Sequence, residues 1–142
     1  MERPIEETHA GAETSAVTIL ADDLIWSTRL ASMLRSIDVA ARTVATLAAF
    51  DRALPAGGPA IVDLTARAYD GVEAVRLAAA RGASILCLVQ HDDLPTRHAA
   101  LAAGATRVVP YRTMHEHGPK TLQRWLAPGV VPAAATVPVA GR

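Results

Sequence analysis

The stretch Ser84-Ile-Leu-Cys-Leu-Val89 (SILCLV) says most about the fold of this 142-residue chain. After its serine the stretch is apolar at every position, without the polar residues that alternate in a strand with one face in water. Continuous apolar strands are typical of parallel sheets that helices cover on both faces. The stretch therefore predicts a buried strand of a parallel sheet over residues 84–89.

Shorter strand-like segments lie on both sides of this run and alternate with helical patterns. The predicted strands are residues 17–21, 39–44, 60–63, 84–89 and 106–109. The predicted helices cover residues 26–37, 47–54, 72–82 and 96–103, and a short last helix follows Gly118-Pro119. Five strand–helix alternations within about 110 residues predict one α/β domain, with a five-stranded parallel sheet between helices on both faces.

The start of the last helix depends on two conflicting signals. Thr113-x-x-Glu116 matches a capping box, which would begin a helix there. Gly118-Pro119 follows immediately and is a combination that interrupts helices. We give the interruption precedence and expect Gly118-Pro119 to open a short last helix.

Both ends of the chain lack the periodicity of folded elements. Residues 1–15 have no apolar period and are expected to form a flexible N-terminal tail, while residues 127–142 are rich in Pro and Ala and are expected to form a C-terminal tail. The expected folded unit is therefore residues 16–126, a common size for a single domain.

Composition excludes several classes of function. The formal net charge is zero and the pI is about 7.0, so we expect no basic face for nucleic acid. The chain has one cysteine, no apolar leader and no apolar run near the length that spans a bilayer. We therefore expect a cytoplasmic protein that binds neither nucleic acid nor membrane.

Three carboxylates follow two of the predicted strands. Asp22-Asp23 follows the first strand and Asp63 ends the third, so a parallel sheet would bring them to the same edge. Clustered carboxylates repel unless a cation or a shared proton relieves them, and Mg²⁺ prefers such oxygen ligands. An aspartate beside a cation can also attack a phosphoryl group. The competing interpretation is structural, with the pair capping the first helix and Asp63 capping the turn after its strand.

The order of these features resembles the receiver domain of two-component response regulators. In that family an acidic pair follows the first strand, the phosphate-accepting Asp ends the third, and a Gly stands eight residues further on. Asp22-Asp23, Asp63 and Asp70-Gly71 match this pattern, and residues 99–105 (AALAAGA) match a segment that precedes the fifth strand. The resemblance implies a flavodoxin-like (βα)5 fold with strand order 2-1-3-4-5, Asp63 as phosphoacceptor, and Mg²⁺ bound by Asp22, Asp23 and Asp63.

Two residues of the family's pattern are missing. The family places a Ser or Thr at the end of the fourth strand and a Lys at the end of the fifth, whereas an ungapped count from Gly104 gives Val89 and Tyr111. An alignment on Pro110 would give Val109 instead of Tyr111. Val89 and Tyr111 are therefore degenerate switch positions, and the resemblance places Thr65 and His91 at the rim of the site.

The missing residues change the expected function. A phosphoryl group shifts a protein only if it binds one state better than the other, and a hydroxyl and an ammonium group would provide that difference. We therefore expect a stand-alone atypical receiver that is not an enzyme and acts mainly by binding a protein. The resemblance implies a histidine kinase or a downstream signalling protein as partner, and a second copy of the chain is another candidate.

Two other functions stay open. The first is a conventional receiver that takes phosphate on Asp63 from a histidine kinase. The second is a small-molecule-binding or enzymatic domain on the same kind of sheet, although the chain lacks a G-x-G-x-x-G loop, a Walker loop and a G-x-S-x-G motif.

Overall fold

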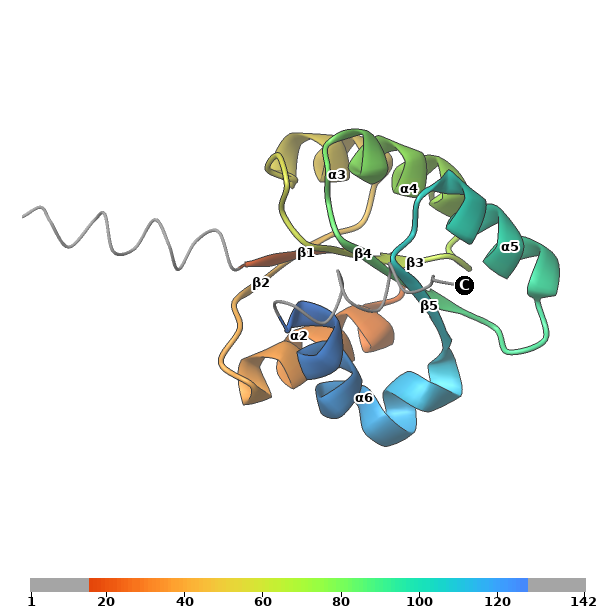
Figure 1. Ribbon diagram of the computed structural model, residues 1–142. Coiled ribbons are helices and arrows are strands. Elements are labelled where there is room, and N and C mark those ends of the chain that lie inside the picture. The colour runs from red at the N-terminus through yellow and green to blue at the C-terminus, as the bar shows by residue number, and fades with distance from the viewer. Residues whose placement is uncertain (1–15, 128–142) are drawn as a thin grey trace, which may run out of the picture.

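The computed structural model describes residues 16–127 as one layered α/β unit (Figure 1). The strands are β1 (Val17–Leu20), β2 (Ala41–Val44), β3 (Ala60–Asp63), β4 (Ile85–Val89) and β5 (Arg107–Pro110). The helices are α2 (Leu24–Ser36), α3 (Leu47–Ala53), α4 (Gly71–Ala80), α5 (Leu94–Ala103) and α6 (Tyr111–Leu126). All strand pairs are parallel and their order is β2-β1-β3-β4-β5. The predicted sheet, its strand order and its helical cover are confirmed.

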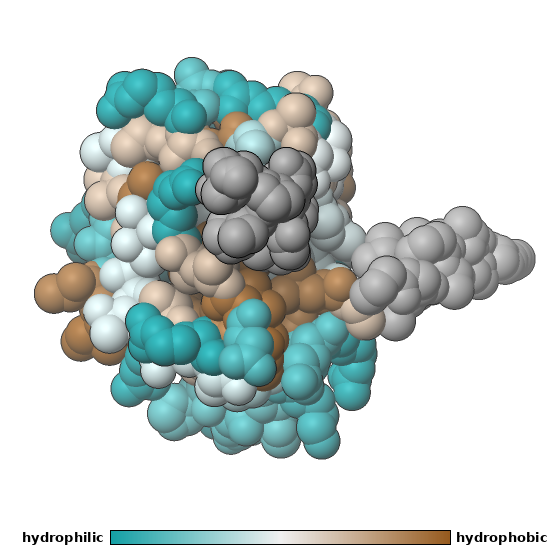
Figure 2. All heavy atoms as spheres, turned by 90° about the vertical axis from the view of Figure 1, so that its left-hand side faces the viewer, coloured by the Kyte–Doolittle hydropathy of each residue, from teal (hydrophilic) through white to brown (hydrophobic). Residues whose placement is uncertain are grey.

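The helices form one layer on each side of the sheet. Helices α3, α4 and α5 cover one face and α2 and α6 cover the other (Figure 1). On the face that holds the start of β1, hydrophobic atoms cross the middle of the molecule between more hydrophilic atoms above and below (Figure 2). This is the arrangement of a sheet enclosed between two amphipathic helix layers.

Alternation along the strands divides the core in two. In β3, Val62 faces the core under α3, α4 and α5, and Ile61 faces the core under α2 and α6. Because successive side chains point to opposite faces, Asp63 points to the same side as Ile61. The last residue of β3 therefore lies on the side of the sheet that α2 and α6 cover.

The last helix differs from the prediction. It begins at Tyr111, directly after Pro110, and consists of two helical segments joined at His117, whose φ of −135° and ψ of 32° are not helical. Pro119 lacks the N–H that would continue the hydrogen-bond ladder, and the chain leaves the helical conformation just before it, at His117. The predicted interruption is therefore present, one residue before Gly118, whereas the first helical segment, which begins at Tyr111, was not predicted. The capping box also does not begin the helix, because the first turn already precedes Thr113.

Gly104 ends α5 in a conformation that only glycine adopts easily. Its φ is +119°, and a Cβ placed there would lie 2.6 Å from the Cβ of Ala79 on α4. The residue therefore permits both the left-handed turn and the close approach of α5 to α4.

Replacing Gly104 with alanine should lower the free energy of unfolding by about 2–4 kcal/mol, through left-handed backbone strain and overpacking against α4. Gly82→Ala is the matched control, because Gly82 has a φ of +78° but nothing within 4 Å of an added Cβ. That variant should lose only about 1–2 kcal/mol. Urea unfolding measures both, and equal losses would contradict the packing role of Gly104.

Candidate functional site

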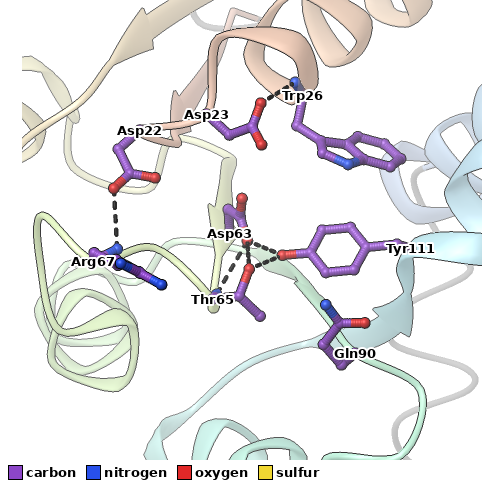
Figure 3. A pocket seen from close by; sticks show the side chains of 8 residues that line it. All are labelled: Asp22, Asp23, Trp26, Asp63, Thr65, Arg67, Gln90 and Tyr111. Atoms are coloured by element: carbon purple, nitrogen blue, oxygen red, sulfur yellow. Dashed lines mark hydrogen bonds between the residues drawn. The ribbon is translucent and has the colours of Figure 1, made fainter.

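The carboxyl ends of the strands surround one pocket of about 570 Å³. Its lining residues come from β3, from α2 and α6, and from the loops after β1, β3 and β4: Asp22, Asp23, Trp26, Asp63, Thr65, Arg67, Gln90 and Tyr111. We call it the acidic pocket, because it contains three carboxylates and a single guanidinium group (Figure 3). The prediction that the three aspartates meet at one edge of the sheet agrees with this geometry.

Asp63 is the most enclosed of the three acids, with 2% of its surface exposed. Its Oδ1 accepts hydrogen bonds from the Thr65 amide at 3.1 Å, from the Thr65 hydroxyl at 3.0 Å and from the Tyr111 hydroxyl (Figure 3). Its Oδ2 has no hydrogen-bond partner among residues 16–127. The carboxylate therefore has one satisfied oxygen and one that is available to a ligand.

The other two acids hold backbone at the edge of the pocket. Asp23 caps α2 by accepting from the amides of Ile25 and Trp26 at 2.8 and 3.1 Å. Asp22 accepts from the amides of Arg67 and Ala68, both at 3.0 Å, and so ties the loop after β3 to the end of β1. The capping interpretation is thus correct for Asp23, whereas Asp22 caps a loop and not α2.

These carboxylates suit a hydrated cation better than a fully dehydrated one. Each of them keeps one oxygen without a hydrogen-bond partner in the described part of the chain. Within residues 16–127, however, no three acidic, His or Cys side chains are gathered closely enough to enclose a metal ion. Mg²⁺ usually keeps several waters and binds one or two carboxylates directly, so the donor chemistry fits and the magnesium site stays a prediction.

Tyr111 is the residue whose role sequence reasoning missed. It is the first residue of α6, and its hydroxyl donates to Asp63 and also contacts the hydroxyl of Thr65 (Figure 3). Burial, followed by the hydrogen bond to Asp63, raises the pKa of Tyr111 well above its ordinary value, so the phenol remains a neutral donor. The ungapped count placed Tyr111 at the family's lysine position, and the structure brings this side chain, not that of Val109, to Asp63.

The end of β4 presents a different residue from the one expected. Val89 is 2% exposed and faces the core under α3, α4 and α5, so it contributes nothing to the acidic pocket. The next residue, Gln90, lines the pocket instead. Thr65 lines it as predicted, whereas His91 is not among the lining residues.

Tyr69 fixes the strand ends that carry the acids. Its buried hydroxyl lies 3.0 Å from the carbonyl oxygen of Leu20 and 2.8 Å from that of Asp63, so one proton bridges the ends of β1 and β3. Burial, and then the charge of Asp63, raise the pKa of Tyr69 far above its ordinary value. Nothing in the local sequence pattern distinguishes this tyrosine.

No protein-family model matches the sequence, and no curated protein matches it. Solved structures do match. The receiver domain of DrrB from Thermotoga maritima in its BeF3-activated form has a TM-score of 0.67 and 18% identity, with 78% of this chain and 96% of that one covered.

Two further solved structures share this fold. A response-regulator receiver protein from Burkholderia phymatum has a TM-score of 0.64 and 24% identity over 78% of this chain and 94% of that one. The receiver domain of a sensor histidine kinase from Pseudomonas aeruginosa, with a magnesium ion coordinated in its active-site cleft, has a TM-score of 0.67 and 22% identity over 79% and 97%. The chain therefore has the fold of response-regulator receiver domains, as the resemblance implies. Among the described residues, no helix has the length and apolar character to cross a bilayer.

Stability should fall steeply in alkali because the folded state holds phenol and thiol protons tightly. Burial raises the pKa of Cys87 to about 12 from 9.0, and both tyrosines shift in the same direction. The unfolded chain therefore releases these protons first, and stability that is complete below pH 9 is lost as the pH rises toward the folded pKa values. Tyr69→Phe should reduce the slope above pH 10 by about 1.4 kcal/mol per pH unit, measured by urea unfolding. An unchanged slope would contradict the buried proton on Tyr69.

The contact between Tyr111 and Asp63 should appear as a coupling energy of about 1–2 kcal/mol in a double-mutant cycle of Tyr111→Phe and Asp63→Ala. The reason is that each single change removes the same charge-assisted hydrogen bond. Asp70→Ala, which removes a cap of α4, is the control partner and should be additive with Tyr111→Phe. Equal coupling energies in the two cycles would contradict the contact between Tyr111 and Asp63.

Proposed function

We propose that this protein is an atypical receiver that acts in signal transduction mainly by binding another protein, with impaired switching by phosphorylation. One observation carries this proposal: the neutral hydroxyl of Tyr111, at the position where the family has a lysine, donates to Oδ1 of Asp63. The receiver fold of the neighbouring structures supports the signalling role.

The composition of the acidic pocket supports impaired switching. In the described part of the chain Arg67 is the one cationic side chain that lines it, and the ends of β4 and β5 contribute the amide of Gln90 and the phenol of Tyr111. The chain's single lysine, Lys120, is an exposed residue in the second segment of α6. A charge-assisted contact contributes about 1.5–3 kcal/mol, so a phosphoryl group here would lack most of the differential binding that drives a switch.

Magnesium is part of the proposal. Asp22, Asp23 and Asp63 would hold the hydrated ion, which would supply positive charge against the three carboxylates and against the oxygens of an incoming phosphoryl group. The proposed partners are a histidine kinase or a downstream signalling protein, and self-association through a second copy is the other candidate.

A conventional phosphoacceptor is the second candidate function. The observation in its favour is Asp63 Oδ2, which has no hydrogen-bond partner within residues 16–127 and belongs to a carboxylate that lines the pocket. Such an oxygen can attack a phosphoryl donor while Oδ1 keeps its hydrogen bonds.

Backbone NMR spectra separate the two functions. With Mg²⁺ and beryllofluoride, which stands in for a phosphoryl group, the wild-type spectrum should change only at residues that line the acidic pocket. We expect no change on α5 or β5, since neither a Ser or Thr directly after β4 nor a lysine directly after β5 is there to convey the event. Asp63→Asn is the control for specific binding. Shifts across α5 and β5 that vanish in Asp63→Asn would establish the conventional receiver instead.

A further inference from the structure

Two aromatic rings from different helices pack together beside Asp63. Trp26 lies in the first turn of α2 and Tyr111 begins α6, and their ring centroids are 5.2 Å apart at an interplanar angle of 42° (Figure 3). Both residues line the acidic pocket, and only Tyr111 reaches the carboxylate. We call this pair the aromatic lid.

Arg29 makes a second connection between the same two helices, next to the aromatic lid. The guanidinium of Arg29, one turn after Trp26, stands 5.5 Å from the centre of the Trp26 ring. Its Nη1 lies 2.9 Å from Nδ1 of His115, one turn after Tyr111 on α6. Arg29 thus makes a cation–π contact with the indole and links it to the helix that carries Tyr111.

Trp26 has no polar contact with any of the three carboxylates through its side chain, so its packing explains its place in the pocket. A tyrosine ring on a helix end can turn about χ1, and a tilted ring contact restricts that rotation. The orientation that results is the one in which the phenol donates to Asp63.

We propose that Trp26 is a positioning residue that holds the Tyr111 hydroxyl on Asp63, so that the aromatic lid sets the rate at which this carboxylate reacts. The inference rests on the proposed function, in which Asp63 is the reactive carboxylate. To that function it adds a role for Trp26 of α2, which keeps the hydrogen bond between Tyr111 and Asp63 in place.

The effect of the aromatic lid can be measured by the transfer of a phosphoryl group from a small acyl phosphate to Asp63. Asp63 Oδ2 attacks the phosphorus of acetyl phosphate, the bond between phosphorus and the acetyl oxygen breaks, and acetate leaves with the electron pair. A phenol donating to Oδ1 draws electron density from the carboxylate and so weakens Oδ2 as a nucleophile. Releasing the phenol therefore accelerates the transfer.

The test compares phosphorylation rates of the full chain with acetyl phosphate and Mg²⁺, followed by mass spectrometry. Tyr111→Phe keeps a ring against Trp26 but loses the hydroxyl, and it should react about tenfold faster than wild type, the rate equivalent of about 1.4 kcal/mol. Trp26→Ala should also react several-fold faster, although its Tyr111 hydroxyl is intact. Because Trp26 acts through Tyr111, the double variant should react no faster than Tyr111→Phe alone.

Leu24→Ala is the matched control. Leu24 belongs to the same turn of α2 and is 79% exposed, and its variant should react at the wild-type rate. A Trp26→Ala rate equal to that of wild type would overturn the proposal. Additive effects in the double variant, or the absence of phosphate on all variants, would overturn it too.

Fluorine NMR gives a readout that does not depend on phosphorylation. The chain has two tyrosines, so fluorotyrosine labelling gives two signals, and Tyr69→Phe assigns the one from Tyr111. Trp26→Ala should shift and narrow the Tyr111 signal, and an unchanged signal would overturn the positioning role. The proposed function fails separately, if phosphorylated protein shows backbone shifts across α5 and β5, whatever the rates of the variants.

Discussion

A nearly inaccessible carboxylate at the end of β3 is the constraint around which this edge of the molecule is organised. Removing a charge from water is costly unless hydrogen bonds or opposite charges replace the lost solvation. Asp63 is 2% exposed and receives its three donors from Thr65 and Tyr111. The neighbouring strand ends are fixed in turn by Tyr69, whose hydroxyl bridges the carbonyls of Leu20 and Asp63.

The neutral hydrogen-bond donors of Asp63 determine the charge of the acidic pocket. The donors come from a threonine and a tyrosine, both neutral, so among residues 16–127 the one cationic side chain that lines the pocket against the three carboxylates is Arg67. A neutral phenol is a hydrogen-bond donor but cannot provide the charge of an ammonium group to a phosphoryl ligand. The proposed impairment of phospho-switching rests on this difference in charge.

The sequence was sufficient for much of the fold because the relevant signals are local. The apolar run in residues 84–89 indicated a strand covered on both faces, and β4 is buried at all five of its positions. Asp70-Gly71 was recognised by its spacing, and Asp70 indeed caps α4. In the last helix, Gly118-Pro119 correctly signalled a break, which lies at His117, but the helical segment from Tyr111 was missed because it depends on packing against α2 and the sheet.

By itself the sequence determined the order of strands and helices and the edge at which the three aspartates gather, since these follow from periodicity and from the parallel direction of the strands. Only the tertiary structure decided which side chain engages Asp63. The Tyr111 contact joins residues 48 positions apart, and its geometry depends on the alternation of β3, the start of α6 and the ring of Trp26. No local pattern encodes a contact of this kind, because the direction of a side chain is set by the elements packed around it.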